Sequence, residues 1–339
     1  MSERLEDIAA AMVREGQGIL AADESSGTIK KRFDQINLES TADNRRDYRE
    51  MLFRAEAMQD AISGVILFDE TLRQSAKDGT PLAELIRAAG AVPGIKVDAG
   101  AKPLVGTKGE KITEGLDGLR ERLAEYHKLG ARFAKWRAVI DIPAGPSHNA
   151  IHANAHALAR YAALCQEAGI VPIVEPEVIM DGADCTHDIK TCEMVTTWIL
   201  KEVYQELYFA GVALEGTILK PNMIVPGQHG PKASREEVAE RTVKVLKDCV
   251  PTAVPGIAFL SGGQSDEEAT AHLSIMNAMG SLPWALTFSY GRALQQAALK
   301  AWGGKPENVA AAQAAFNHRA RMNGLAATGR WSADLEKAA

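Results

Sequence analysis

The chain has 339 residues, 46% of them hydrophobic and 24% charged, which is typical of a soluble globular protein. A formal net charge of −6 gives no electrostatic reason to expect nucleic acid or an anionic membrane as a partner. No apolar run approaches the ~20 residues that span a bilayer, and the acidic first residues exclude a signal peptide. With only four cysteines, the composition predicts a cytoplasmic protein.

Short apolar segments recur along the chain and are predicted to be strands. They are GQGILAAD from residue 16, SGVILFDE from 63, VPGIKVDAG from 92, ARFAKWRAVI from 131, VPIVEPEV from 171, LEGTILKPNM from 214, GIAFLSGG from 256 and LPWALTFSYG from 282. Their nearly continuous apolar character is typical of parallel strands covered by helices. Between them lie amphipathic helical patterns, two of which open with the capping pairs Ser234/Glu237 and Ser265/Glu268.

Eight strand-plus-helix units predict a closed (β/α)8 TIM barrel, whereas six or seven would have indicated an open doubly wound sheet. The first strand is not followed by a G-x-G-x-x-G fingerprint, and a P-loop is also missing from the sequence. Residues from about 304 to 339 are predicted to form one or two extra C-terminal helices and a tail that begins at about 326. We therefore expect a single barrel domain over residues 1–339.

A charged or reactive residue lies at or near the C-terminal end of every predicted strand. These residues are Asp23, Asp69, Lys96, Lys135 with Arg137, Glu175 with Glu177, Lys220, Ser261, and Ser289 with Arg292. A single charge at a strand end is usually a solvated loop residue. Eight in a row predict an active site, because barrel enzymes build theirs on this rim.

Lys220 directly follows the buried strand residues 217–219, where an ammonium is costly unless it is compensated. Lys135 and Arg137 are two residues apart and share a strand face, as do Glu175 and Glu177. A half-buried lysine beside another cation has a lowered pKa and becomes a nucleophile, so we interpret Lys220 as an amine that attacks a carbonyl group. The alternative is a lysine that pairs with a rim glutamate only to stabilise the barrel.

The seventh and eighth strands end in LSGGQS and FSYGR, which offer free backbone N–H groups before a helix. This is the usual phosphate position of such a barrel, and Arg292 adds a planar donor. Simple turn chemistry is the alternative for the Gly-Gly pair. Lys96, Arg137 and the basic segment 30–32 are candidates for a second phosphate across the mouth.

Metal binding is the main rival chemistry. His148, His152 and His156 are spaced four residues apart on one helical face, but the segment contains no acidic or thiol third ligand. Cys185, His187 and Cys192 do not have the usual zinc spacing. We therefore expect the histidines to form a solvated helix face, and we predict no metal.

Seven segments together closely resemble the signatures of one enzyme family. They are GILAADESSGTIKKR, GIKVDAG, FAKWR, PIVEPE, GTILKPNM, FLSGGQS and FSYGRALQ, in order along most of the chain. The family is class I (Schiff-base) fructose-1,6-bisphosphate aldolase. The resemblance implies a (β/α)8 barrel, usually a homotetramer, that needs no cofactor. It reversibly cleaves fructose 1,6-bisphosphate to dihydroxyacetone phosphate and glyceraldehyde 3-phosphate.

The resemblance also implies a role for each matching residue. Lys220 would form the Schiff base and Glu175 would be the general acid and base. Asp23 would orient the C4 hydroxyl and the Schiff-base lysine, or help to deprotonate that hydroxyl. Lys135 would lower the pKa of Lys220 and stabilise developing negative charge, and Glu177 would hydrogen-bond among the lysines. The C1 phosphate would be held by Ser261, Gly262, Gly263, Ser289, Gly291 and Arg292. The C6 end would be held by Arg32, Lys96 and Arg137, with Ser25 and Thr28 as further candidates.

One feature departs from the family pattern: no tyrosine follows Tyr290, although many members end in a mobile tyrosine that assists proton exchange. We expect that step not to depend on the tail here. Two alternatives remain, a non-catalytic barrel that binds a partner and another Schiff-base enzyme such as a transaldolase or single-phosphate aldolase. The complete lysine–carboxylate set disfavours the first, and two opposed phosphate sites disfavour the second.

Overall fold

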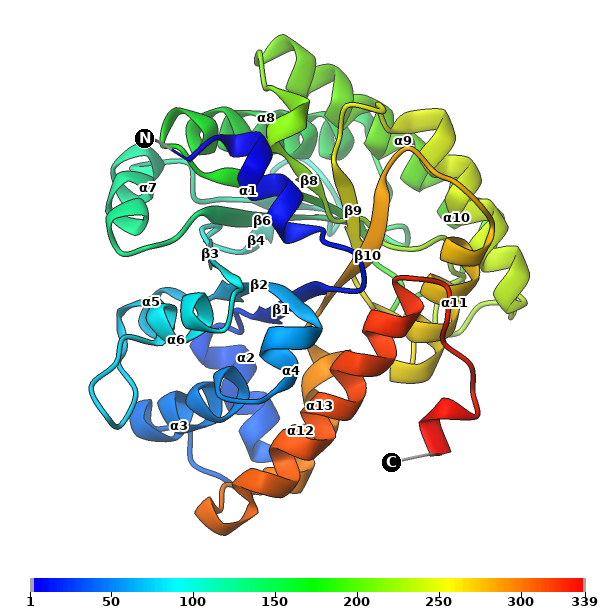
Figure 1. Ribbon diagram of the computed structural model, residues 1–339. Coiled ribbons are helices and arrows are strands. Elements are labelled where there is room, and N and C mark those ends of the chain that lie inside the picture. Colours follow the sequence, from blue (N-terminus) through cyan, green and yellow to red (C-terminus); the bar gives the residue numbers. More distant parts are fainter. Residues whose placement is uncertain (1–2, 338–339) are drawn as a thin grey trace.

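Eight parallel strands close into a barrel in the computed structural model, which describes residues 3–337 (Figure 1). Around the barrel the strands follow the order β1-β10-β9-β8-β7-β6-β3-β2. Their bounds are β1 Gly18–Ala22, β2 Ile62–Leu67, β3 Val92–Lys96, β6 Phe133–Ile140, β7 Val171–Val178, β8 Ile218–Leu219, β9 Gly256–Phe259 and β10 Ala285–Tyr290. Seven of them fall within the predicted apolar segments and β2 begins one residue before its segment, so the predicted (β/α)8 barrel is confirmed.

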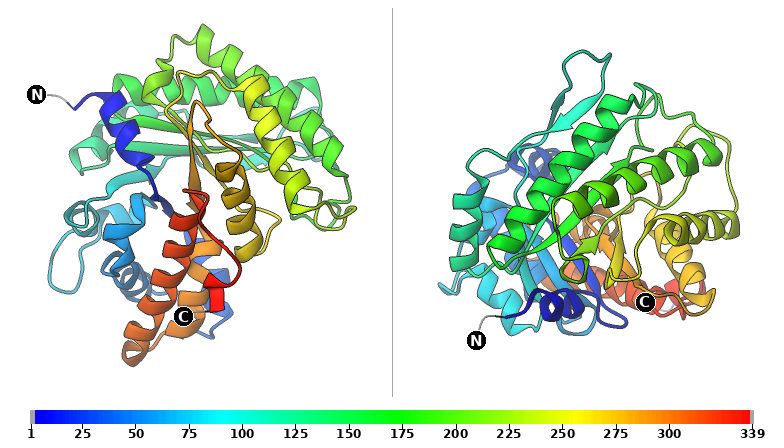
Figure 2. Two further views of the ribbon diagram at one scale, coloured as in Figure 1. Left: turned by 45° about the vertical axis from the view of Figure 1, so that its right-hand side comes forward. Right: turned by 90° about the horizontal axis from the view of Figure 1, so that it is seen from above.

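Helices surround the barrel on its outer side (Figure 2). They are α2 Ser26–Asp34, α3 Ala42–Phe53, α4 Ala57–Asp60, α5 Asp69–Arg73, α6 Leu82–Ala88, α7 Leu119–Lys128, α8 His148–Glu167, α9 Ile189–Phe209, α10 Arg235–Cys249, α11 Asp266–Ala278 and α12 Arg292–Trp302, with the short η1 Leu214–Gly216. Ser234 and Ser265 cap α10 and α11, each accepting a bond from the backbone N–H three residues later at 3.1 Å. No helix among the described residues is long and apolar enough to cross a membrane.

Two additions extend the eight-unit pattern. A short antiparallel hairpin, β4 Ala101–Pro103 and β5 Lys111–Thr113, follows β3, and the sequence analysis did not predict it. After α12 come η2 Pro306–Asn308, α13 Val309–Ala326 and η3 Leu335–Lys337. Glu336 in η3 accepts a bond from Arg319 at 2.5 Å, which ties the described end of the chain back onto α13.

The barrel interior changes character from one end to the other. Helix α1 (Leu5–Met12) lies across the N-terminal end of the strands (Figure 1), where Ile8 and Met12 pack with inward-facing Phe133 and Ile173. Towards the C-terminal end the inward positions become charged. On β6, Phe133 is followed at the same face by Lys135 and Arg137, and on β7, Ile173 is followed by Glu175, which lies in register with Arg137. One end of the barrel is therefore sealed by apolar side chains, and the other carries the charges.

Gly94 in β3 leaves the room that the ring of Phe133 fills. A Cβ atom at this position would overlap the ring, because the neighbouring strand brings Phe133 directly against the Gly94 backbone. We expect Gly94→Ala to lower the free energy of unfolding by about 1–3 kcal/mol, the usual cost of overpacking. Denaturant unfolding checks this, with Gly27→Ala as the control because a Cβ there meets no atom within 4 Å. An unchanged Gly94→Ala midpoint would contradict the packing described here.

Candidate active site

A cavity of about 680 Å³ opens at the C-terminal ends of the strands, and all eight strand ends contribute to its wall. Six basic and five acidic side chains line it: Arg32, Lys96, Lys135, Arg137, Lys220, Arg292, Asp23, Glu24, Asp98, Glu175 and Glu177. Both the volume and the few convergent polar groups are typical of a small-molecule site. The mouth is thus slightly basic although the whole chain carries a charge of −6.

The deepest part of the cavity holds two lysines and two carboxylates in mutual contact. Lys220 Nζ lies 3.0 Å from Glu175 Oε1, and Lys135 Nζ lies 2.7 Å from Asp23 Oδ2 and 3.4 Å from Glu175 Oε2. The side chains of Lys220 and Glu175 are only 5% and 4% exposed. The four residues predicted from the sequence are therefore brought together.

Lys220 is positioned by the segment that follows β8. Its backbone N–H donates to the carbonyl of Val174 at 2.8 Å, which continues the ladder for one residue beyond the two-residue strand. Asn222, which is buried, accepts from the N–H of Val178 at 3.0 Å and donates to Thr196 at 3.1 Å. The Lys-Pro-Asn sequence thus ends the strand and fastens it to β7 and α9, so that the amine is held in the cavity.

The charges of the cluster stabilise one another. Burial by itself would raise the pKa of Asp23, but Lys135, Lys220 and Lys96 outweigh it and hold that pKa well below its usual range. Burial would lower the pKa of Lys135, but Asp23, Glu175 and Asp98 keep it well above the ordinary value. The pKa of Glu175 is also lowered, since Lys135, Lys220 and Arg137 outweigh burial. Asp23 and Glu175 are therefore anionic and Lys135 is cationic.

Small residues and an arginine surround the part of the cavity next to β9 and β10. Ser261, Gly262, Ser289, Gly291 and Arg292 all line it. Within residues 3–337 the buried Ser289 hydroxyl has no hydrogen-bond partner, which is unusual for a buried polar group. Arg292 bonds to Asp266 at 2.9 Å. Gly263 lies apart from this wall and borders a neighbouring hollow against Met180.

The other predicted basic residues are already paired. Lys96 contacts Asp98 at 2.5 Å, and Arg137 pairs with Glu177. Arg32 pairs with Glu24 and also lies beside Gly291, so it is closer to the β10 loop than the sequence analysis expected. Ser25 caps α2 by accepting from the N–H of Thr28, and both residues line the cavity.

Sequence reasoning missed several residues of the site. Asp98 and Glu24 hold Lys96 and Arg32, and Asn222 fixes the lysine strand. Each of the three lies within two residues of a predicted site residue. This proximity in the sequence is the signal that could have identified them. Asp69, by contrast, lies outside the cavity wall. It starts α5 and bonds to Arg73 and to Tyr126 at 2.9 Å.

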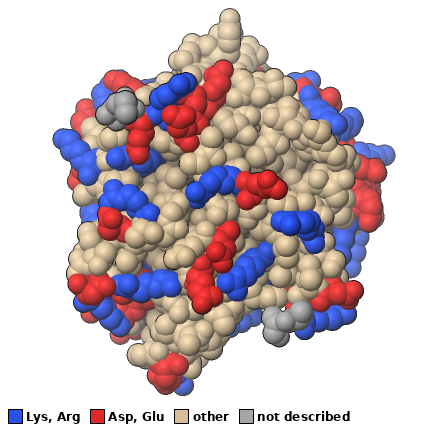
Figure 3. All heavy atoms as spheres, in the orientation of Figure 1, with Lys and Arg blue, Asp and Glu red and all other residues tan. Residues whose placement is uncertain are grey.

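The surface away from the cavity does not concentrate one sign of charge on the face seen in Figure 3. Basic and acidic side chains are interspersed there. Exposed charges outside the cavity also pair with one another, as Arg73 does with Asp69 at 3.0 Å. Interspersed charge favours solubility over binding of a polyanion.

The fold and cavity define a barrel enzyme with a charged C-terminal mouth. The family model described as "Glycolytic: Fructose-bisphosphate aldolase class-I" matches residues 4–339, and the chain belongs to the class I fructose-bisphosphate aldolase family. It is 58% identical over 332 residues to a probable fructose-bisphosphate aldolase class 1 of Xanthomonas axonopodis pv. citri, covering 97% of this chain and 98% of the relative. It is 54% identical to the cytosolic fructose-bisphosphate aldolase 6 of Arabidopsis thaliana, covering 95% and 89%.

A solved structure agrees with this assignment. The fructose-bisphosphate aldolase of Plasmodium falciparum, crystallised with TRAP and a small-molecule inhibitor, superposes with a TM-score of 0.94 at 50% identity. The match covers 97% of this chain and 95% of the other. Similarity at this level extends over nearly the whole chain.

Proposed function

We propose that this chain is a fructose-bisphosphate aldolase that reversibly cleaves fructose 1,6-bisphosphate to dihydroxyacetone phosphate and glyceraldehyde 3-phosphate through a Schiff base on Lys220. The observation that carries the proposal is the 3.0 Å contact between the Lys220 amine and the Glu175 carboxylate inside a cavity of about 680 Å³. A nucleophile within hydrogen-bond reach of a base is the arrangement that covalent catalysis requires.

The charge state of the cluster supports a definite sequence of proton transfers. Glu175 takes a proton from the Lys220 ammonium, and the neutral amine attacks the C2 ketone. The attacking nitrogen passes a second proton to the new C2 oxygen, which becomes a hydroxyl. Glu175 then returns the first proton to this hydroxyl, which leaves as water and forms the iminium. Lys135 remains protonated throughout and stabilises developing negative charge, as its raised pKa allows.

Carbon–carbon cleavage is assigned to the second carboxylate. Asp23, held anionic by its lysine neighbours, accepts the hydrogen bond or the proton of the C4 hydroxyl. The electrons of the C3–C4 bond then move to the iminium and form an enamine. A proton at C3 and hydrolysis of the iminium release dihydroxyacetone phosphate and free Lys220.

The two phosphates bind on opposite sides of the mouth in this proposal. Ser261, Gly262, Ser289, Gly291 and Arg292 hold the C1 phosphate, with Gly263 shaping the loop behind them. Arg32 joins this set because it lies beside Gly291. Lys96 and Arg137 hold the C6 phosphate together with Ser25 and Thr28, and Glu177 orients Arg137.

Ser289→Ala tests the first phosphate position. Because the Ser289 hydroxyl has no hydrogen-bond partner among the described residues, we expect no loss of stability. A lost bond to a charged group costs about 1.5–3 kcal/mol, so kcat/KM should fall about tenfold to a hundredfold. The fall should be equal for fructose 1,6-bisphosphate and fructose 1-phosphate, which share the C1 phosphate. Ser274→Ala, buried and outside the cavity, is the control.

Trapping with borohydride tests the whole proposal. We expect incubation with dihydroxyacetone phosphate and borohydride to add one mass label per chain, on Lys220, and activity to survive a chelator. A chain without an adduct would be a non-catalytic barrel. Equal kcat/KM for fructose 1-phosphate and the bisphosphate would instead indicate a single-phosphate Schiff-base enzyme. So would a Lys96→Met variant whose kcat/KM for the bisphosphate is unchanged, because Lys96 is proposed to hold the C6 phosphate.

We also propose that the chain assembles as a homotetramer and works in the cytoplasm. The family resemblance supports the first, and cytosolic relatives such as the one from Arabidopsis thaliana support the second. Light scattering of the purified chain tests the assembly, and a mass of one or two chains would refute it.

A further inference from the structure

Helices α8 and α9 pack against each other on the outside of the barrel, and their contact contains a row of histidines. His148, His152 and His156 are four residues apart on α8, and their rings stack with centroids 6.1 and 6.3 Å apart. Their side chains lie outside the active-site wall. The sequence suggested a solvated face because it contained no third metal ligand nearby.

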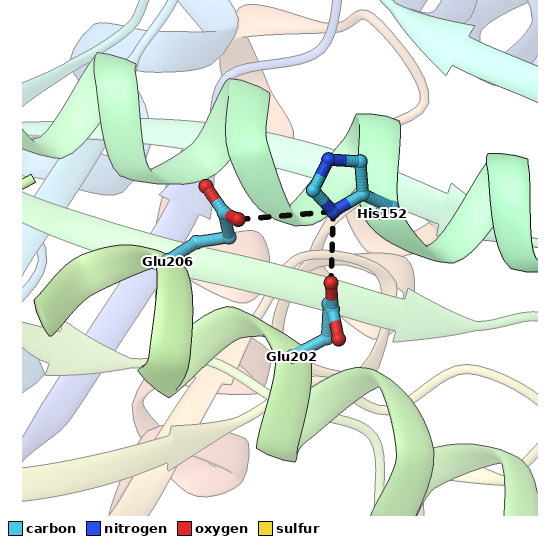
Figure 4. A group of neighbouring side chains, drawn as sticks. All are labelled: His152, Glu202 and Glu206. Atoms are coloured by element: carbon cyan, nitrogen blue, oxygen red, sulfur yellow. Dashed lines mark hydrogen bonds and ion pairs between the residues drawn. The ribbon is translucent and has the colours of Figure 1, made fainter. Parts of the chain in front are cut away.

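The neighbouring helix supplies the missing acidic groups (Figure 4). Glu202 and Glu206 are four residues apart on α9 and point at the same imidazole. His152 Nδ1 lies 2.8 Å from Glu202 Oε1 and 3.7 Å from Glu206 Oε1. His156 Nδ1 lies 2.9 Å from the second oxygen of Glu206. Two pairs with the same spacing on adjacent helices therefore converge.

These two carboxylates lack the partners that other acidic groups of α9 have. Within residues 3–337 the ion-pair partners of Glu202 and Glu206 are His152 and His156, and neither carboxylate pairs with a lysine or arginine. Glu193, on the same helix and 14% exposed, pairs with both Arg241 and Lys244 at its two oxygens. Glu202 and Glu206 are 20% and 12% exposed. Two mostly buried carboxylates thus adjoin imidazole nitrogens and no lysine or arginine among the described ion pairs.

We propose that His152, Glu202 and Glu206 form a binding site for a divalent transition metal ion, with Zn²⁺ the best match and His156 available as a fourth ligand. The three ligand atoms all lie within 4.8 Å of one another. Tetrahedral zinc with bonds of about 2.0–2.2 Å needs separations of about 3.4 Å, which small side-chain rotations on the half-exposed His152 provide. An imidazole binds a metal through a ring-nitrogen lone pair, so a metal-bound His152 would direct Nδ1, the nitrogen next to Glu202, at the ion and carry its proton on Nε2.

The choice of metal follows from the ligands. Imidazole with carboxylates suits zinc and neighbouring transition metals, whereas magnesium and calcium prefer oxygen-only sites. An ion here would neutralise the two carboxylates and cross-link α8 to α9. Because the site is separate from the active-site cavity, it bears on the stability of the helix pair and not on the aldol reaction.

Zinc titration of the chelator-treated full chain against a chromophoric competitor tests the proposal. We expect one Zn²⁺ per chain, no competition from Mg²⁺, and binding at least about tenfold weaker in His152→Ala and in Glu206→Gln, since even an indirect ligand partner is worth that much. His148→Ala is the matched control: it belongs to the same ring stack but has no carboxylate partner among the described ion pairs. Zinc should also raise the Tm of the parent and of His148→Ala but not of His152→Ala.

A thiol site is the competing explanation, because Cys249 is only partly buried. Retained binding in His152→Ala and Glu206→Gln, or binding lost in Cys249→Ser, would overturn the proposal. X-ray absorption of the zinc-loaded chain should show nitrogen and oxygen neighbours only, and sulfur neighbours would also refute it. Light scattering measures the assembly state of each variant. If a variant loses zinc and also changes its assembly, the ligand atoms seen by X-ray absorption of the zinc-loaded parent decide whether the proposal holds.

Discussion

Lys220→Arg is expected to lower kcat for cleavage of fructose 1,6-bisphosphate by about 10⁵-fold or more, the scale of loss seen when a covalent nucleophile is removed. Arginine keeps the positive charge opposite Glu175, but its guanidinium does not deprotonate in proteins and cannot form the Schiff base. The borohydride label should disappear with the activity. Steady-state kinetics and mass analysis of the intact chain measure the two effects.

Lys135→Met separates this interpretation from a purely structural one. Lys135 lies in the same buried cluster, 3.4 Å from Glu175, but is not the proposed nucleophile. It should lose activity while still giving the Lys220 adduct. Lys220→Met, which lacks the bulk of arginine, should reproduce the loss with a cooperative unfolding transition. An adduct that persists in Lys220→Arg would show that another lysine forms the bond.

Glu175→Gln is expected to lower kcat by about 10²–10⁴-fold with a smaller change in KM, the usual contribution of general acid–base catalysis. Glutamine keeps the shape of the side chain but cannot carry the proton between Lys220 and the C2 hydroxyl. The carbinolamine should then accumulate. Because borohydride reduces the iminium and not the carbinolamine, it should trap less adduct per chain than in the parent. Stopped-flow quenching with borohydride follows the slowed dehydration directly.

The same substitution also removes a buried negative charge. In the described part of the chain, Glu175 is the carboxylate that pairs with Lys220. When Glu175 is replaced, Lys135 still has Asp23 as an ion-pair partner, whereas Lys220 has none. We therefore expect Glu175→Gln to be less stable, because an unpaired buried charge is costly. Glu110→Gln is the control, since Glu110 is equally buried but lies outside the cavity. Normal kcat in Glu175→Gln would refute the proton-transfer role.

The predictions from sequence succeeded where a local pattern has one physical meaning. A buried strand such as 171–178 alternates inward and outward, so Glu175 and Glu177 had to share a face with one another. A strand end in a parallel barrel lies on the common rim, so Lys96, Lys135 and Lys220 were expected to meet. The serine caps at 234 and 265 follow from the same kind of local rule.

Other features depended on which elements lie side by side. Nothing in the sequence around His152 indicates that Glu202 and Glu206, 50 and 54 residues away, would face it, because that contact depends on how α8 and α9 pack. Asn222 was not predicted as a site residue, and its contact with the N–H of Val178 ties the segment after β8 to β7. The hairpin β4–β5 has strands of three residues each, too short to produce a clear alternation.

By itself the sequence determined the order of the eight units, most of the rim residues and the family resemblance, because these depend on local periodicity and on residue type. Only the tertiary structure decided which carboxylate pairs with which lysine, that Arg32 lies beside Gly291, and that two outer helices bring histidines and glutamates together. Contacts between distant segments depend on helix packing and strand register, and a linear pattern does not specify them to within a hydrogen-bond length.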